Sequence, residues 1–242
     1  MFSLKRFSPW MANYIPSRAK SGTSSRRWVL RQMVDPHAKK SKTEGYRSRA
    51  AYKLLEIDTK FRLFGKHAKN IVDLGFAPGA WTQVALSKSR AKGTVPNVLG
   101  VDLIHCQAPE GSSFVQGDIF SKKTHDEISA FFEPKGPLNL VLSDMMANTS
   151  GLGDNDHYAS MELCDGVLIL ALSMLQKGGN LVMKFYTGKE DQLLQKRLEK
   201  VFSRVHKMKP TACRAESREM YFVCLKKKKD KVAVEDVYEP VA

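Results

Sequence analysis

Short apolar runs alternate with helix-length segments between residues 70 and 225. We interpret seven runs as strands: Asn70–Leu74, Val98–Asp102, Ser113–Gln116, Leu138–Ser143, Asn180–Phe185, Arg204–Met208 and Met220–Leu225. The helical segments are Arg47–Ile57, Gly79–Arg90, Lys122–Phe132, His157–Gln176 and Asp191–Phe202. Asp156 is placed to cap the helix that begins at His157. Strands that alternate with helices of this length predict a single α/β domain with a doubly wound, mostly parallel sheet.

The size and apolar content of the chain suit one such domain with extensions. The chain has 242 residues, of which 43% are hydrophobic, and this excludes a wholly disordered protein. Its longest apolar run, Val167–Leu175, is interrupted by Ser173 and is far shorter than the ~20 residues that span a bilayer. We expect a soluble monomer with no membrane partner.

The four cysteines, Cys106, Cys164, Cys213 and Cys224, show no CxxC motif and no repeated spacing. A zinc site would need histidines or further cysteines at short spacing, and only His105 next to Cys106 comes close. We therefore predict free thiols in a reducing compartment, and no metal.

The basic charge is concentrated at the N-terminus. The formal net charge is +14, and residues 1–53 hold 13 of the 39 Lys and Arg residues but only two acidic ones, Asp35 and Glu44. Residues 54–225 are nearly neutral, and a second basic run, Lys226–Lys229 with Lys231, lies near the C-terminus. Such asymmetry indicates nucleic-acid binding, a targeting sequence or both.

The first 34 residues are rich in Arg and Ser and contain no acidic residue, which is typical of an organelle transit peptide. We predict a mitochondrial transit peptide over residues 1–25, a basic arm over 26–46, the catalytic domain over 47–225, and a lysine-rich tail over 226–242. The alternative for the N-terminal segment is a basic tail that binds RNA directly.

Three aspartates follow successive predicted strands, at the edge where an open α/β sheet binds ligands. The loop Asp73–Trp81 follows the first strand, and its Gly75 and Gly79 let the backbone approach a ligand closely. Ala77 and Pro78 break the GxGxxG pattern, so a pyrophosphate, and with it a nicotinamide dehydrogenase, is disfavoured. Asp102 can accept both hydroxyls of a ribose, and Asp118 can accept from an adenine amino group. S-adenosylmethionine fits such a site best.

Asp144 and Lys184 end two later strands. A buried ammonium without a partner is costly, so Lys184 and Asp144 could form a structural ion pair. The alternative is that both face the cleft that holds the nucleoside.

The motifs around these residues resemble the FtsJ/RrmJ family of ribose 2′-O-methyltransferases, and its mitochondrial ribosomal RNA members most closely. The matching segments, between Arg47 and Leu225, are Arg47–Leu54, Asp73–Trp81, Gly100–Leu103, Gly117–Asp118, Ser143–Met145, Val182–Lys184 and Ser217–Tyr221. The chain departs from the family at Phe76 and Ala80, which replace smaller residues, and at Ala147, where proline is common.

The resemblance implies a Rossmann-like methyltransferase fold with S-adenosylmethionine as cofactor. The family's Lys–Asp–Lys–Glu tetrad corresponds to Lys53, Asp144, Lys184 and Glu219. It implies Lys184 as the base for the 2′-hydroxyl, Asp144 as its orienter, and Lys53 and Glu219 as residues that position the ribose. The implied cofactor contacts are Pro78, Gly79, Ala80, Trp81, Asp102, Asp118 and Asp144.

The resemblance favours ribosomal RNA as the partner, specifically a uridine in the peptidyl-transferase region of the mitochondrial large subunit precursor. The basic residues Arg47, Arg49 and Lys53 near the expected catalytic face agree with an RNA substrate. Two alternatives stay open: a tRNA 2′-O-methyltransferase, and a non-catalytic RNA-binding factor in ribosome assembly. The intact tetrad argues against the second.

Overall fold

The computed structural model describes residues 35–147 and 153–238. By its contacts the chain divides into a short N-terminal unit, residues 1–36, and a larger unit, residues 37–242, that contains the whole sheet. The predicted transit peptide and residues 26–34 of the predicted basic arm lie outside the described residues. Within the described part, the arm contains the helix α2 (Pro36–Thr43).

A seven-stranded sheet with the order β3-β2-β1-β4-β5-β7-β6 forms the centre of the larger unit. The strands are β1 (Asn70–Leu74), β2 (Asn97–Asp102), β3 (Ser113–Gln116), β4 (Leu138–Ser143), β5 (Leu175–Tyr186), β6 (Phe202–Met208) and β7 (Glu219–Lys227). β7 runs antiparallel to both of its neighbours, β5 and β6, and all other neighbouring strands in this sheet pair in parallel. The prediction of a doubly wound, mostly parallel sheet in a single α/β domain is confirmed.

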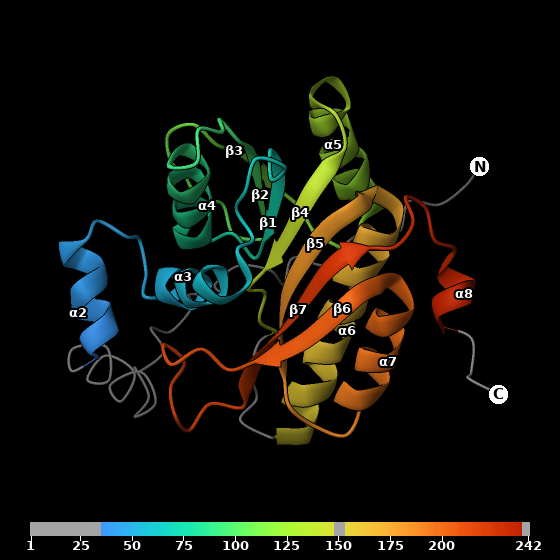
Figure 1. The fold of residues 1–242 in the computed structure, drawn as a ribbon. Helices are drawn as coiled ribbons and strands as arrows, with labels where there is room; N and C mark the ends of the chain where they lie inside the picture. The colour runs from blue at the N-terminus through green and yellow to red at the C-terminus, as the bar shows by residue number, and fades with distance from the viewer. Residues whose placement is uncertain (1–34, 148–152, 239–242) are drawn as a thin grey trace, which may run out of the picture. The chain divides into compact units, whose positions relative to one another are not determined.

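Helices cover both faces of the sheet (Figure 1). The larger helices are α3 (Ala50–Phe61), α4 (Ala80–Arg90), α5 (Lys122–Phe132), α6 (Gly153–Met174) and α7 (Asp191–Val201). One hydrophobic cluster joins the sheet to α3 and α4, and a second joins it to α5, α6 and α7. On α3 the buried residues Ala51, Leu54 and Ile57 recur every three residues, which is the spacing that one helix face requires.

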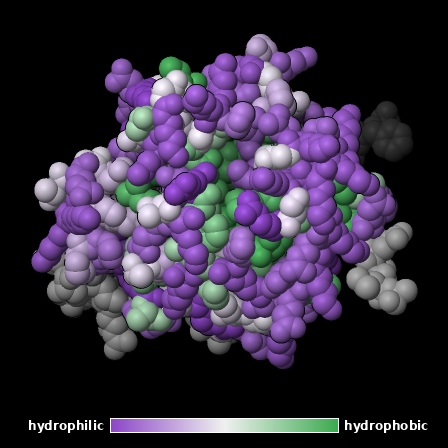
Figure 2. Space-filling model, in the orientation of Figure 1, coloured by the Kyte–Doolittle hydropathy of each residue, from purple (hydrophilic) through white to green (hydrophobic). Residues whose placement is uncertain are grey.

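The molecular surface is mostly hydrophilic on the face drawn in Figure 2, and hydrophobic groups gather in a hollow near its middle. No helix within the described ranges has the length and apolar character needed to cross a bilayer.

Several predicted boundaries are corrected by the structure. The helix predicted from His157 begins at Gly153, so Asp156 lies inside its first turn and is not its N-cap. Asp154 and Asp156 in that turn complement the positive end of the helix dipole, and this favours an earlier start. The lead-in helix begins three residues later than predicted and ends at Phe61, where Arg62 adopts a left-handed conformation (φ 53°).

Two strands, β5 and β7, are longer than predicted. β5 begins at Leu175, five residues before the predicted start at Asn180, and Gly178 within it has a positive φ of 79° that lets the strand bend and continue. β7 continues to Lys227, two residues into the predicted tail, and the short helix α8 (Val234–Tyr238) follows it.

Lys227 is buried, with 1% of its surface exposed. Its ammonium donates to four backbone carbonyls: Ala171 (2.7 Å), Leu172 (2.8 Å), Leu175 (2.7 Å) and Asp230 (2.9 Å). The first two are among the last carbonyls of α6, which have no partner within their own helix. Lys227 therefore caps the C-terminus of α6 from inside the protein.

Candidate active site

The four residues of the predicted tetrad meet at the carboxyl edge of the parallel strands. Lys53 comes from α3, Asp144 follows β4, Lys184 lies near the end of β5, and Glu219 begins β7. Lys53 Nζ lies 2.6 Å from Glu219 Oε1 and 3.8 Å from Asp144 Oδ2. Lys184 Nζ lies 3.1 Å from Asp144 Oδ1 and also donates to the Asp144 carbonyl at 2.6 Å. Two cations and two anions thus alternate in one chain of contacts.

Strand register explains why residues so distant in sequence converge. β5 and β7 are antiparallel, and Lys184 pairs with Tyr221 while Tyr186 pairs with Glu219. Glu219 and Tyr221 lie two residues apart on β7 and therefore point to the same face. The turn after β4 brings Asp144 to this face because the parallel pairing of β4 with β5 sets Ser143 beside Met183.

Tyr221 is a member of the site to which sequence reasoning assigned no role. Its side chain is fully buried, and its hydroxyl lies 2.7 Å from Asp144 Oδ1 and 2.5 Å from Glu219 Oε1. One hydroxyl proton serves two carboxylates, so Tyr221 holds the two acidic groups together. The signal available in the sequence was the spacing of Glu219 and Tyr221, which lie two residues apart on a strand and therefore share one face.

The surroundings of Asp144 and Lys53 favour the charged form of each side chain. Burial raises the pKa of Asp144, but the charges of Lys184 and Lys53 and the hydrogen bond from Tyr221 outweigh it, so this pKa lies below its ordinary value. Burial lowers the pKa of Lys53, but Asp144 and Glu219 outweigh it and leave this pKa raised. Burial, together with both carboxylates, raises the pKa of the Tyr221 hydroxyl, which remains a donor.

The glycine-rich loop after β1 lies beside the tetrad. Gly75 has a φ of +74°, and a Cβ there would stand 2.8 Å from the Met145 backbone, so only glycine fits against the turn that carries Asp144. Gly79 (φ +99°) is the N-cap of α4. The first amides of α4 therefore point into the loop region without intrahelical partners, which is a site for an anionic group.

Asp73 is the penultimate residue of the buried strand β1, and one of its carboxylate oxygens has no partner among the described residues. Oδ2 accepts from the Thr82 hydroxyl at 2.7 Å, whereas the buried Oδ1 has no partner among the described residues. Burial, followed by the negative charges of Asp144 and Asp102, raises the pKa of Asp73 to about 7. A cation placed next to Oδ1 would stabilise the carboxylate.

Asp102 and Asp118 lie at the ends of β2 and β3, as predicted. The Asp102 oxygens accept from the backbone N–H groups of Ala77 (2.8 Å) and Ile104 (2.9 Å). Asp102 therefore also holds the glycine-rich loop. Asp118 is exposed, and its Oδ1 accepts from the Phe120 N–H at 3.0 Å. Three exposed apolar side chains follow these aspartates: Leu103, Ile104 and Phe120.

Ala80 and Trp81 are buried, so only their backbone faces the loop. The Trp81 indole N–H donates to the Ala50 carbonyl at 2.9 Å, and its ring packs against Tyr221 at 5.7 Å between centroids. Trp81 thereby fixes α3, and with it Lys53, against β7. Pro78 is exposed at the rim of the loop.

Phe76, one of the departures from the family pattern, packs inward. Its ring lies directly over Gly100, where a Cβ would stand only 2.1 Å from it, and 5.2 Å from the Phe114 ring. The larger residue is thus accommodated by a glycine on β2. Ala147 precedes residues that lie outside the described ranges.

Arg47 and Arg49, predicted to contact RNA, bond within the protein. Arg47 donates to the carbonyls of Pro78 (3.0 Å) and Gln107, and Arg49 donates to the Ala212 carbonyl. Both arginines therefore help to fix loops around the site.

A seven-stranded sheet with one antiparallel strand, a glycine-rich loop after β1 and a Lys–Asp–Lys–Glu cluster define a methyltransferase of the Rossmann-like class. A family model described as FtsJ-like methyltransferase matches residues 46–227. The chain belongs to this family, as its motifs predicted.

Similar proteins come from fungi and bacteria. The chain is 34% identical to "rRNA methyltransferase 2, mitochondrial" of Saccharomyces cerevisiae, over 87% of this chain and 90% of that protein. It is 40% identical to the protein of the same name from Schizosaccharomyces pombe, over 83% and 95%. It is 39% identical to "Ribosomal RNA large subunit methyltransferase E" of Bartonella bacilliformis, over 86% of this chain and 87% of that protein.

A solved structure of a ribosomal RNA methyltransferase, so titled, from Plasmodium falciparum has the same fold. It is 30% identical, has a TM-score of 0.68, and covers 76% of this chain and 100% of its own. The methyltransferase fold predicted from the sequence is thus confirmed by a relative of known structure.

Proposed function

We propose that this enzyme methylates the 2′-oxygen of a ribose in mitochondrial large-subunit ribosomal RNA, with S-adenosylmethionine as methyl donor, and thereby contributes to ribosome assembly. The observation that carries the proposal is the closed cluster of Lys53, Asp144, Lys184 and Glu219 beside the glycine-rich loop. The names of the fungal relatives support ribosomal RNA and the mitochondrion. We propose a uridine of the peptidyl-transferase region as the target and the matrix as the location.

The residues around the loop fit S-adenosylmethionine. The free Oδ1 of Asp73 suits its amino group, and the first amides of α4 suit its carboxylate. Asp102 can bind the ribose hydroxyls and Asp118 the adenine amino group, whereas the exposed Leu103, Ile104 and Phe120 offer apolar surface for the base. The bound cofactor supplies a methyl group already activated on a sulfonium.

Lys184 is the proposed base. The carboxylate and carbonyl of Asp144 hold its amine by two contacts, so the nitrogen has a fixed direction. In its neutral form Lys184 would accept the 2′-hydroxyl proton, which would make the ribose oxygen a stronger nucleophile toward the methyl group that the bound cofactor would supply. Lys53 and Glu219, paired at 2.6 Å, position the ribose, and Tyr221 keeps both carboxylates in place. Positioning of this kind supplies much of the acceleration.

Mapping of 2′-O-methyl groups in total RNA, with and without the gene, tests the function. We expect one ribose methylation of the mitochondrial large-subunit RNA to disappear and to return with the wild-type gene. Loss of a tRNA methylation instead would show the tRNA enzyme. An unchanged methylation map would show a non-catalytic assembly factor.

Asp102→Ala should weaken cofactor binding. The variant leaves two ribose hydroxyls without their acceptor and loosens the loop that Asp102 holds through Ala77, so we expect a loss of roughly 1–3 kcal/mol. Calorimetric titration with S-adenosylmethionine measures it. Glu110→Ala removes an exposed carboxylate from the same β2–β3 connection and serves as control. Equal affinities of the two variants would remove Asp102 from the cofactor site.

Deletion of residues 1–25 should redirect the protein without unfolding it. The described core begins well after this segment, so the thermal transition of the truncated protein should stay nearly unchanged. Fluorescence microscopy of tagged chains should show the full chain in mitochondria and the truncated chain in the cytosol. Mitochondrial import of the truncated chain would contradict the transit-peptide prediction.

A further inference from the structure

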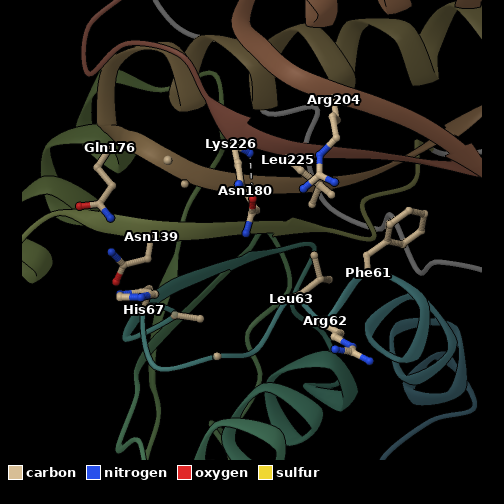
Figure 3. Close-up of a pocket in the computed structure, with 14 residues that line it drawn as sticks. Phe61, Arg62, Leu63, His67, Asn139, Gln176, Asn180, Arg204, Leu225 and Lys226 are labelled. Atoms are coloured by element: carbon tan, nitrogen blue, oxygen red, sulfur yellow. Dashed lines mark hydrogen bonds between the residues drawn. The ribbon is translucent and has the colours of Figure 1, made fainter.

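A second pocket lies at the opposite edge of the sheet from the tetrad. It has a volume of about 280 Å³ and lies between the end of α3, the loop that precedes β1, the starts of β4 and β5, and the strands β6 and β7 (Figure 3). On β7, Glu219 lies at the edge of the sheet that holds the tetrad, and Lys226 lies at the edge that holds the pocket. At about 3.3 Å per residue these two residues lie roughly 23 Å apart. The pocket is therefore separate from the active site.

The ionisable side chains around this pocket are all basic. Arg62, His67, Arg204 and Lys226 line it, and no acidic side chain does. None of these four side chains forms an ion pair or a hydrogen bond with the described part of the chain. The surrounding sequence has the same character, since residues 59–72 contain three lysines, Arg62 and His67 without a single Asp or Glu.

Two asparagines are oriented so that their amide nitrogens remain available. The Asn139 Oδ1 accepts from the backbone N–H groups of Lys69 (3.1 Å) and Asn70 (2.7 Å), and the Asn180 Oδ1 accepts from that of Lys226 (3.0 Å). The Asn139 oxygen accepts two N–H groups and the Asn180 oxygen accepts one, so each of these side chains keeps its NH₂ group available to a ligand. Figure 3 shows the Asn180 nitrogen directed into the pocket.

This arrangement selects an anion with several oxygen acceptors. Guanidinium groups and amide N–H groups match the geometry of phosphate oxygens, and Arg62 and Arg204 supply two such forks from different elements. The volume suits a phosphodiester with part of its sugar, and Phe61, Leu63 and Leu225 provide an apolar wall for the latter. Lys226 also begins the lysine run of the C-terminus, which continues the positive charge away from the pocket.

We propose that this pocket binds a backbone phosphate of the RNA substrate, as a second anchor remote from the methylated ribose. The inference rests on the proposed function and deepens it. Because the pocket and the tetrad lie roughly 23 Å apart along β7, the anchored phosphate belongs to a nucleotide several positions from the target along one strand, or to another strand of a folded RNA.

The double variant Arg62→Gln with Arg204→Gln tests the proposal in the full chain. Binding of a fluorescein-labelled transcript of the peptidyl-transferase region is followed by anisotropy over a range of salt concentrations. We expect at least a tenfold higher Kd near physiological salt, and a salt slope of log K that is lower by about 0.7–0.9, since the contact with one phosphate is lost. Turnover at saturating RNA should stay at the wild-type value, because neither residue belongs to the tetrad.

The matched control is Lys92→Gln with Lys196→Gln, which removes two exposed cations outside the pocket. A double pocket variant that binds the transcript as well as this control would overturn the proposal while leaving the methyltransferase function intact. A wild-type chain that neither binds nor methylates the transcript would overturn both.

Experiments with inorganic phosphate and with anionic vesicles distinguish RNA from a free phosphate anion and from a lipid headgroup. Saturable thermal stabilisation by millimolar phosphate, lost in the pocket variant while RNA binding matches the control, would assign the site to a free anion and overturn the proposal. Retention of the wild-type chain on phosphatidylserine vesicles, lost in the variant under the same condition, would assign it to a lipid headgroup. Weaker RNA binding by the pocket variant alone supports the phosphodiester.

Discussion

Lys184→Ala should lose methyl transfer by on the order of 10²-fold or more, the usual contribution of a general base. The amine of Lys184 is fixed by the carboxylate and carbonyl of Asp144, and no other amine touches both of these groups among the described residues. Cofactor binding should survive, because the proposed adenosine contacts lie on Asp102, Asp118 and the Gly79 loop. The measurement is transfer of a radiolabelled methyl group to the transcript, with calorimetric titration of the cofactor beside it.

Lys184→Arg separates catalysis from structure. A guanidinium keeps the charge and can pair with Asp144, but it stays protonated and cannot take the hydroxyl proton. We expect a folded, cofactor-binding and inactive protein. An active Lys184→Arg enzyme would leave Lys184 as an electrostatic positioner only. Lys189→Ala, an exposed lysine in the following loop, is the control and should retain wild-type activity.

Most strands were predictable because the parallel sheet is buried on both faces. β1 and β4 are such buried apolar runs and have the predicted bounds. β3 also has the predicted bounds, although none of its residues is buried. Of the tetrad, Asp144 and Lys184 were predictable because they lie at strand ends, and parallel strands bring their carboxyl ends to one edge. Lys53 on α3 and Glu219 at the start of the antiparallel β7 were assigned only through the family resemblance.

Other features depend on contacts that no local pattern reveals. The spacing of Glu219 and Tyr221 places both on one strand face, but only the folded structure shows that the Tyr221 hydroxyl reaches two carboxylates. The start of α6 was misplaced because Asp156 resembles a cap, although acidic residues are equally suited to the first turn. The phosphate pocket joins segments from five elements, so neither its shape nor the orientation of its asparagines could be predicted from the sequence.

Lys227 is the clearest such case, and Lys227→Met should destabilise the fold by at least about 3 kcal/mol. In the sequence it is one lysine in a basic run, but its ammonium is buried and donates to four carbonyls. Methionine keeps the length of the side chain and leaves these acceptors desolvated without a donor. For a domain of this size the loss corresponds to a decrease in Tm of roughly 6–12 °C, measured by calorimetry.

Lys226→Met is the matched control, because Lys226 is the exposed neighbour on the same strand. Its replacement removes the same charge and should change the free energy of unfolding by less than about 0.5 kcal/mol. The buried lysine lies far along β7 from Glu219, so Lys227→Met should still methylate RNA with a normal kcat at temperatures where it is folded. If both variants unfold at the wild-type temperature, the four carbonyls do not need this ammonium, and Lys227 acts only through its charge, as a residue of a basic tail would.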